Sequence, residues 1–261
     1  ILSDSTIGAE ATKLYKDAMD MLEMIASQQW LTPKAVLGFW PANSNDKDSV
    51  EILDTHANEK IELQFLRQQL KKAEGLPNYS LADFIAPSSS AQQDHIGAFA
   101  VTIHGIEKKI KEFEAVHDDY NKILLQALAD RLAEALAEYL HEKVRKEYWG
   151  YDKQESLSND ALIKEEYTGI RPAPGYPACP DHTEKKKLFH LLDATNQVGI
   201  TLTESLAMYP ASSVCGWYFS HPSSKYFGVG KINKDQLEDY AARKGMSMEE
   251  AEKWLRPILE L

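Results

Sequence analysis

The sequence has 261 residues, of which 43% are hydrophobic and 26% are charged. A chain of this length and composition can bury a sizeable core, as one large domain or as two closely joined lobes. The formal net charge of −11 argues against a nucleic-acid partner, because proteins that bind the phosphate backbone usually have a basic surface. Small molecules and proteins remain as candidate partners.

The sequence offers no sign of a membrane segment or of a disulfide framework. No stretch reaches the roughly 18 to 20 consecutive apolar residues that span a bilayer. The first residues, ILSDSTIGAEA, lack the basic and apolar regions of a signal peptide, so we expect a cytoplasmic protein. Cys179 and Cys215 form no CxxC pair and are interpreted as reduced thiols, with no cysteine zinc site.

Hydrophobic periodicity in the first hundred residues predicts two helices and three strands. Helix and strand breakers separate them: Thr32 and Pro33 predict a turn, Pro41 ends a strand and Gly75 ends a helix. The predicted elements are helices over 7–28 and 61–74, strands over 35–40 and 50–53, and a buried strand over 96–103.

The stretch 106–148 is strongly helical and predicts two helices that meet near 117–120, the second of them long. Polar residues from Arg131 to Arg145, among them Glu134, follow one side of the long helix at three- and four-residue spacings. The predicted apolar face consists of Leu125, Leu128, Leu132, Ala135, Leu136, Tyr139 and Leu140.

The second half of the chain mixes helices and strands without a regular βαβ repeat, which favours an α+β fold with a largely antiparallel sheet. Two aromatic-rich runs, SVCGWYF and KYFGVGKI, predict a β-hairpin joined by SHPSS. The other predictions are helices over 159–166, 183–196, 234–244 and 247–255, an alternating run at 200–208, and an ordered irregular segment over 169–180.

The segment RPAPGYP at 171–177 carries the strongest functional signal. Its prolines fix φ and stiffen the loop, and Gly175 permits close approach of a ligand or of neighbouring backbone. A stiff loop that holds Arg171 and Tyr176 has lost its ordering entropy before binding, as a preorganised ligand platform requires. From the residues alone, a rigid connection packed on the sheet is an equally good interpretation.

RPAPGYP followed by ACPDHTEK resembles the signature of the activation domain of cobalamin-dependent methionine synthase. The resemblance continues through DDYNKILLQALADRLAEALAEYLHEKVRKEYWGY, TLTESLAM, VCGWYFS, SKYFGVG and DQLEDYAARKGMS, essentially from Ile7 to Leu261. It implies a single α+β domain over 1–261 with a twisted antiparallel sheet flanked by helices. It also implies an N-terminal truncation, because the family has an earlier segment whose aspartate contacts the ligand.

The resemblance implies that the chain binds S-adenosylmethionine as methyl donor for the reductive methylation of cob(II)alamin, within a methyltransferase of methionine biosynthesis. The cobalamin-binding domain of the same enzyme would carry the cobalamin, and a flavodoxin or flavoprotein reductase would supply one electron. The sequence lacks a DxHxxG cobalamin motif, a zinc-bound homocysteine site and a folate barrel. The chain is therefore expected to be inactive alone, with no zinc and no catalytic residue of its own.

In the loop, the resemblance assigns ligand contacts to four residues. Arg171 matches an arginine whose guanidinium would pair with the ligand's carboxylate and nearby carbonyl groups. Gly175, Tyr176 and Ala178 match the backbone that faces the adenine.

Outside the loop, Tyr226 and Phe227 match binding contacts at the predicted hairpin, and an aromatic face suits a sulfonium cation. Because the two alternate along a predicted strand, at most one ring is expected to face the ligand. Glu134 matches a carboxylate near the ligand, although its place on the polar side of the helix equally indicates a solvated residue. His182 is attributed to helix capping near Thr183 rather than to the ligand site.

A domain that keeps the fold but only docks the cobalamin domain or flavodoxin remains an alternative. A Rossmann-type methyltransferase is disfavoured, because its only glycine-rich candidate is the GVG at 228–230 in the predicted hairpin. The absence of HExxH and GxSxG motifs disfavours a metalloenzyme or hydrolase.

Overall fold

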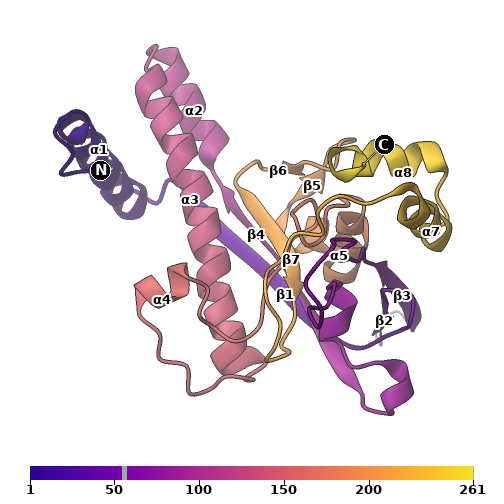
Figure 1. Ribbon diagram of the computed structural model, residues 1–261. Coiled ribbons are helices and arrows are strands. Elements are labelled where there is room, and N and C mark those ends of the chain that lie inside the picture. The colour runs from indigo at the N-terminus through magenta and orange to yellow at the C-terminus, as the bar shows by residue number, and fades with distance from the viewer. Residues whose placement is uncertain (55–57, 261) are drawn as a thin grey trace. The chain divides into compact units, whose positions relative to one another are not determined.

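The computed structural model describes residues 1–54 and 58–260 (Figure 1). Its contacts divide the chain into two compact units, each built from three stretches of sequence. Ile1–Ala35, Val101–Tyr139 and Ile200–Val214 form unit 1, and Val36–Ala100, Leu140–Gly199 and Cys215–Leu261 form unit 2.

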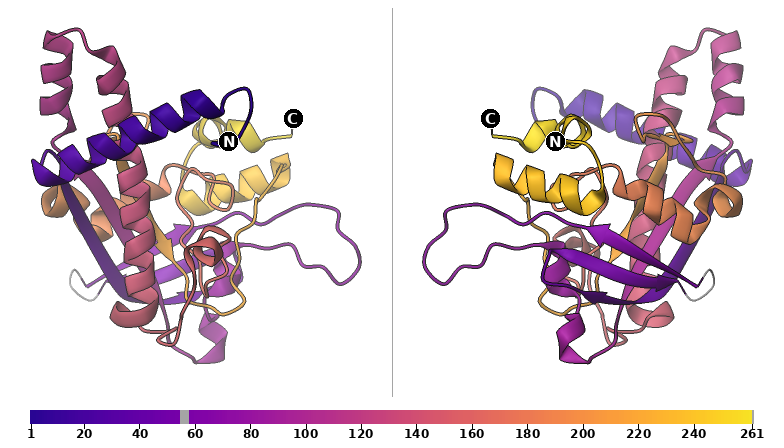
Figure 2. Two further views of the ribbon diagram at one scale, coloured as in Figure 1. Left: turned by 90° about the vertical axis from the view of Figure 1, so that its left-hand side faces the viewer. Right: turned by 90° about the vertical axis from the view of Figure 1, so that its right-hand side faces the viewer.

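Unit 1 is mainly helical. Figure 2 shows α2 (Ile106–Ala115) and α3 (Asp119–Lys143) as an antiparallel helical hairpin. Helix α1 (Gly8–Ser27) buries Met21 and Ile25 in the same apolar cluster, which confirms the predicted helix over 7–28. A two-stranded pair, β5 (Thr201–Leu202) and β6 (Met208–Tyr209), occupies the alternating run at 200–208.

The buried face of the long helix α3 overlaps the predicted one, because Leu125 and Leu140 are both buried. Its fully buried positions in unit 1 include Ala129, Ala133 and Ala137, whereas Ala135 and Tyr139 are exposed. Small residues at helical spacing let neighbouring backbones approach closely, so this alanine row packs inward while larger side chains lie at its margin. The predicted face is thus confirmed at Leu125 and Leu140 and wrong at Ala135 and Tyr139.

The larger sheet has five strands in the order β3-β2-β1-β4-β7. The pairs β1/β2 and β2/β3 are antiparallel, with Ala42 opposite Ile52 and Ile52 opposite Ile61. The α+β class with an antiparallel sheet is thereby confirmed. The strands are β1 (Thr32–Ser44), β2 (Ser49–Asp54), β3 (Glu59–Gln64), β4 (Asp94–His104) and β7 (Ser213–Tyr218).

Three predictions in the first hundred residues are wrong at this sheet. Strand β1 begins at Thr32 and continues through Pro41, so neither the turn nor the strand end lies where it was predicted. The predicted helix over 61–74 is strand β3 followed by irregular backbone. Its apolar residues fit both a helical and an alternating spacing, and antiparallel pairing with β2 selects the strand.

The predicted hairpin of SVCGWYF and KYFGVGKI is also wrong. Only the first run forms a strand, β7, while residues 224–231 are irregular. The backbone beside β7 comes instead from the proline-rich segment: Ile170 pairs with Phe219, and Trp217 N–H donates to the Pro172 carbonyl at 2.9 Å. The second run packs Val229 and Ile232 into a C-terminal apolar cluster.

Short helices complete unit 2 and agree broadly with the predicted positions. The predicted helix over 183–196 is broken at Asp193, whose φ of 48° is left-handed. A π-helical turn, Val144–Tyr148, continues α3. The helices are α4 (Asn159–Ile163), α5 (Glu184–Leu192), α6 (Ala194–Val198), α7 (Lys234–Lys244) and α8 (Met248–Leu255), with 3₁₀ turns at Leu81–Phe84, Ser88–Ser90 and Arg256–Ile258.

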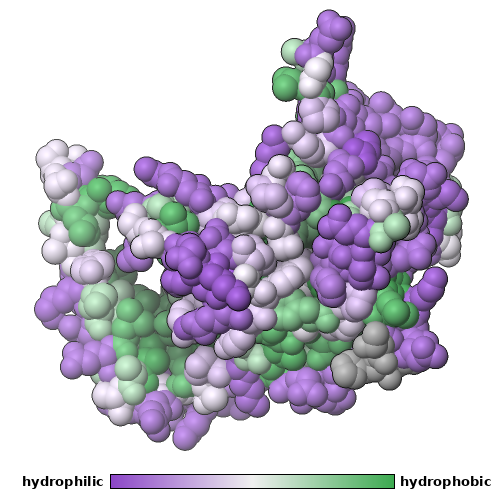
Figure 3. All heavy atoms as spheres, turned by 90° about the horizontal axis from the view of Figure 1, so that it is seen from below, coloured by the Kyte–Doolittle hydropathy of each residue, from purple (hydrophilic) through white to green (hydrophobic). Residues whose placement is uncertain are grey.

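The surface of the protein is mixed in polarity. On the face drawn in Figure 3, hydrophilic side chains surround separate hydrophobic patches. Across residues 1–54 and 58–260, no helix combines the length and the apolar character that crossing a bilayer requires.

Candidate ligand site at the proline-rich loop

The proline-rich loop, residues 171–180 in unit 2, is held along its whole length by backbone hydrogen bonds. The Pro172 carbonyl accepts from Trp217 N–H on β7, and the Pro177 carbonyl accepts from Val229 N–H at 2.8 Å. Within the loop, Gly175 N–H donates to the Cys179 carbonyl at 2.7 Å. The loop is therefore rigid although it contains no helix or strand.

Gly175 is required by backbone conformation and by packing together. Its φ is +95°, and a Cβ built there would lie 2.1 Å from His182 Cε1. Any side chain at this position would displace the imidazole. The close approach that the sequence suggested at Gly175 is thus made by a neighbouring side chain of the same loop region.

Arg171 is half-buried and is bonded through both its side chain and its backbone. Its Nη1 donates to the Tyr167 hydroxyl at 2.9 Å and lies 3.3 Å from His141 Nδ1. Its backbone N–H donates to the Tyr226 hydroxyl at 3.0 Å, and the Tyr226 and Tyr167 hydroxyls are 3.1 Å apart. The structure therefore brings Arg171 and Tyr226 together, but through backbone and hydroxyl rather than through an exposed ring.

His141 lies at the centre of this cluster with no exposed surface. Its ring stacks on Tyr218 at 5.1 Å between centroids and meets Tyr167 edge-on at 5.0 Å. Burial, reinforced by the cations of Arg145 and Arg171, holds its pKa well below 6.5. His141 is consequently neutral near pH 7.

Arg145 corrects the predicted polar stripe of the long helix, because it is fully buried. Its guanidinium forms a bidentate pair with Glu155, in which Nη2 lies 2.8 Å from Oε1, and its Cζ is 4.3 Å from the Tyr167 ring centroid. Helical spacing alone could not show this, since Glu155 lies beyond the helix and turns back on it.

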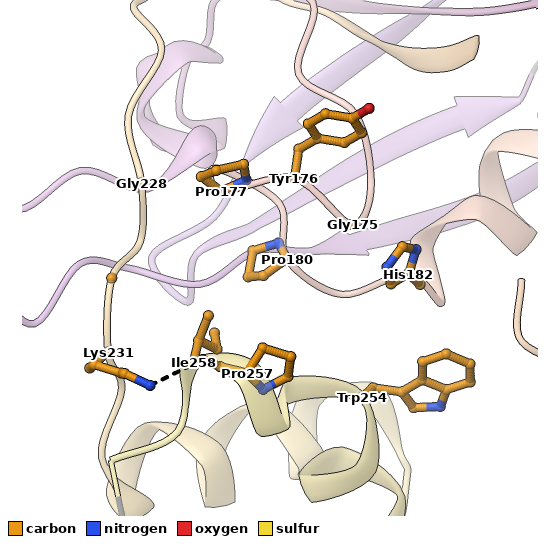
Figure 4. Close-up of a pocket in the computed structure, with 11 residues that line it drawn as sticks. Gly175, Tyr176, Pro177, Pro180, His182, Gly228, Lys231, Trp254, Pro257 and Ile258 are labelled. Carbon is orange, nitrogen blue, oxygen red and sulfur yellow. Dashed lines mark hydrogen bonds between the residues drawn. The ribbon is translucent and has the colours of Figure 1, made fainter. Parts of the chain in front are cut away.

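A pocket of about 470 Å³ opens beside the other end of the loop. Gly175 and Tyr176 line it, whereas Arg171, Ala178, Tyr226 and Phe227 are not among its lining residues. Figure 4 shows the loop on one side and the C-terminal segment on the other. The wall is completed by Pro177, Pro180, His182, Gly228, Gly230, Lys231, Trp254, Pro257 and Ile258.

His182 and the C-terminal residues of this wall were missed by sequence reasoning. The proximity of His182 to RPAPGYP is the signal in the sequence that points to this wall. Within residues 58–260, Thr183 stands at the N-terminus of α5 without a side-chain capping hydrogen bond, and its N–H donates to the Asp181 carboxylate at 2.7 Å. No local pattern marks Trp254 or Pro257, which reach the pocket only through the packing of the C-terminal segment.

Tyr226 and Phe227 both pack inward, so the expected alternation along a strand is wrong. Burial raises the pKa of the Tyr226 hydroxyl, which faces Arg171. The Phe227 ring lies 5.9 Å from the Tyr79 ring and 6.3 Å from the Phe84 ring, between centroids. Without a strand at 224–230, the period-two argument does not apply.

The last two predicted site residues differ in their surroundings. Ala178 is buried, and its backbone N–H donates to no other residue among 1–54 and 58–260. Glu134 is an exposed residue of α3 and belongs to unit 1. Its role as a ligand carboxylate stays a prediction.

A buried ionic cluster fixes the residues that follow the loop. Lys244 of α7 donates to Asp181 and to Glu184 Oε1, the latter at 2.7 Å, and Asp181 also accepts from the Tyr240 hydroxyl at 2.7 Å. Burial would raise the pKa of Asp181, but Lys244 and the hydrogen bonds from Thr183 hold it below the ordinary value. The cluster ties the loop to α7 by charge as well as by packing.

An α+β fold with a stiff loop, an anchored arginine and an adjoining pocket defines a small-molecule-binding domain. Residues 1–245 match the sequence model of the family described as vitamin B12 dependent methionine synthase, activation domain. The chain belongs to this family, and the resemblance stated from the sequence is confirmed. It is thus a domain of a cobalamin-dependent methyltransferase.

The chain is also similar to a solved structure described as "Crystal Structure of the MetH Reactivation Domain bound to AdoHcy". The two share 54% sequence identity with a TM-score of 0.94, over 100% of this chain and 81% of that chain. The match includes the C-terminal residues of the pocket wall, which lie beyond the family match.

Proposed function

We propose that this chain binds S-adenosylmethionine beside the proline-rich loop and holds its methyl group for the reactivation of cobalamin-dependent methionine synthase. The similar reactivation domain bound to AdoHcy, matched over all of this chain, is the observation that carries the proposal. S-adenosylhomocysteine is what remains of the donor after the methyl group has left. A site that holds one therefore has most of the contacts needed for the other.

The residues present fit such a ligand. The Arg171 guanidinium is a planar donor fork suited to a carboxylate, and hydrogen bonds already restrict its position. The N–H of Ala178 supplies a donor on the loop. The proline and aromatic residues of the adjoining pocket suit the flat face of a nucleoside base.

The chain's own residues bind and orient, and none is proposed as an acid or base. His141, the histidine beside Arg171, is fully buried and kept neutral, with its hydrogen bonds directed to other side chains. When bound, the sulfonium supplies an already activated methyl group, so proximity and orientation are the contributions required of the protein. The partners proposed here are the cobalamin-binding domain and a flavodoxin or flavoprotein reductase.

Calorimetric titration of S-adenosylmethionine into this chain and into R171A tests the proposal. The variant should bind more weakly by about 1.5 to 3 kcal/mol, the range for hydrogen bonds to charged groups. Thermal melting of R171A checks that the variant remains folded. No binding by the unaltered chain, together with retained binding to a cobalamin domain, would favour the docking-only alternative.

A further inference from the structure

We infer that His141 and Tyr167 are positioning residues for Arg171, which together fix its guanidinium before a ligand arrives. The inference deepens the proposed function and rests on it, since it supposes that Arg171 meets the ligand. It does not follow from sequence spacing, because His141 lies 30 residues before Arg171.

The direction of the hydrogen bonds assigns the tautomer of His141. A guanidinium has only donors and stays protonated, so His141 Nδ1, 3.3 Å from Arg171 Nη1, must be the acceptor. The ring proton then resides on Nε2, which lies 3.3 Å from the Tyr151 hydroxyl. His141 is thereby held as the neutral Nε2–H form with its lone pair aimed at Arg171.

Tyr167 completes the hold on the guanidinium. Nη1 carries two hydrogens, and the Tyr167 hydroxyl accepts the second at 2.9 Å. That hydroxyl is also bonded to the Tyr226 hydroxyl, which accepts from the Arg171 backbone N–H. Side chain and backbone of Arg171 are thus joined in one closed ring of hydrogen bonds.

The two acceptors are themselves immobile. His141 has no exposed surface and stacks on Tyr218, while Tyr167 is 7% exposed and packs against the guanidinium of Arg145. Glu155 in turn pairs with Arg145 and holds that guanidinium against Tyr167. An arginine otherwise loses considerable rotamer freedom on binding, and this arrangement removes that cost beforehand.

Three variants separate positioning from simple packing. H141F keeps an aromatic ring but loses the acceptor, and Y167F loses only the hydroxyl. H141N restores an acceptor, because the asparagine amide oxygen reaches roughly the place of Nδ1. Y148F is the matched control for a lost hydroxyl, since Tyr148 is 58% exposed and outside the cluster.

Calorimetry with S-adenosylmethionine measures each variant alone and in the R171A background. H141F and Y167F should each weaken binding about tenfold. H141N and Y148F should each weaken it less than about threefold. In the R171A background, H141F and Y167F should change affinity less than about twofold, because their effect passes through Arg171. The inference is overturned if H141F and Y167F lose as much affinity in the R171A background as they do alone. It is also overturned if neither variant loses affinity.

Nitrogen NMR of the histidine ring provides a test that needs no ligand. An unprotonated Nδ1 and a protonated Nε2, with a shift at Nδ1 on R171A substitution, support the inference. A protonated Nδ1 contradicts it. Should the unaltered chain bind no S-adenosylmethionine, the proposed function fails, and the NMR result decides the Arg171–His141 geometry separately. Thermal melts show whether H141F folds, and Y167F gives the second measurement if it does not.

Discussion

The backbone N–H of Arg171 donates to the hydroxyl of Tyr226, which lies 55 residues further along the chain. This bond joins the start of the proline-rich loop to a segment with no regular secondary structure. The resemblance assigns both residues to one ligand site, with at most one of the Tyr226 and Phe227 rings expected to face the ligand. In the structure the hydroxyl instead organises the arginine.

The Tyr226 hydroxyl should therefore matter more than its ring. In Y226F the Arg171 N–H would lose its acceptor in a largely buried setting, which costs about 1 to 3 kcal/mol of unfolding free energy. Urea denaturation measures this loss, with Y209F as a control, since Tyr209 is 55% exposed. Equal stabilities for Y226F and Y209F would show that the bond contributes nothing.

Stability should decline as the pH falls below the ordinary histidine pKa. Burial lowers the pKa of His141 in the folded protein, so protons bind more readily to the unfolded chain. The resulting stability is fully present above pH 6.5, the ordinary value, and is lost progressively below it. Denaturation between about pH 7 and pH 5 should show a smaller decline for H141N.

A second histidine contributes in the same direction and needs its own control. Burial first, and then Lys185, lowers the pKa of His182 in the pocket wall. H182N should therefore reduce the pH dependence of the unfolding free energy less than H141N does, because His182 is less buried than His141. An unchanged pH dependence of stability in H141N would mean that His141 has the same pKa in the folded and the unfolded protein.

The buried ionic cluster should be far more sensitive than surface ion pairs. In K244M, the carboxylates of Asp181 and Glu184, 2% and 0% exposed at the side chain, would lose their common cation. Removing one partner of a buried pair costs about 3 to 5 kcal/mol. K234M is the control, because Lys234 is 77% exposed in its pair with Glu238 and should change stability by less than about 1 kcal/mol. Similar losses of stability in K244M and K234M would show that the buried ionic cluster is no more sensitive than a surface ion pair.

Long, strongly periodic elements were predictable from the sequence, and elements decided by distant partners were not. Helix α1 and the buried strand β4 carry their signal in their own residues. By contrast, 61–74 has apolar spacings that fit helix and strand alike, and only pairing with β2 selects β3. Alternation likewise could not reveal that Phe219, directly after β7, pairs with Ile170 and not with the following aromatic run.

The residues of the candidate site likewise fall into those that the sequence could identify and those that depend on distant contacts. Arg171, Gly175 and Tyr176 stand in one stiff loop with a recognisable motif, so sequence could place them together. His141 sits on a helix where it resembles any core histidine, and its role depends on a contact 30 residues away. Trp254 and Pro257 join the pocket only when the C-terminal segment packs beside the loop.

Methyl transfer should require a cobalamin domain and an electron in addition to this chain. The proposed site consists of an anchored arginine, a stiff loop and an apolar pocket, which hold and orient a donor but offer no acceptor for its methyl group. Because the sulfonium is already activated, docking an acceptor over the bound donor supplies the proximity that the reaction needs. The chain alone should therefore bind S-adenosylmethionine without consuming it.

Donor labelled in its methyl group tests this in three mixtures: the chain alone, the chain with a cobalamin domain, and both with reduced flavodoxin. Label should reach cobalamin only in the third mixture, because cob(II)alamin must gain an electron before it can accept the methyl group. R171A in the third mixture should transfer label more slowly at low donor concentration and recover as the donor is raised, since the residue acts in binding. Label leaving the donor with the chain alone, on any acceptor, would identify a self-sufficient methyltransferase instead.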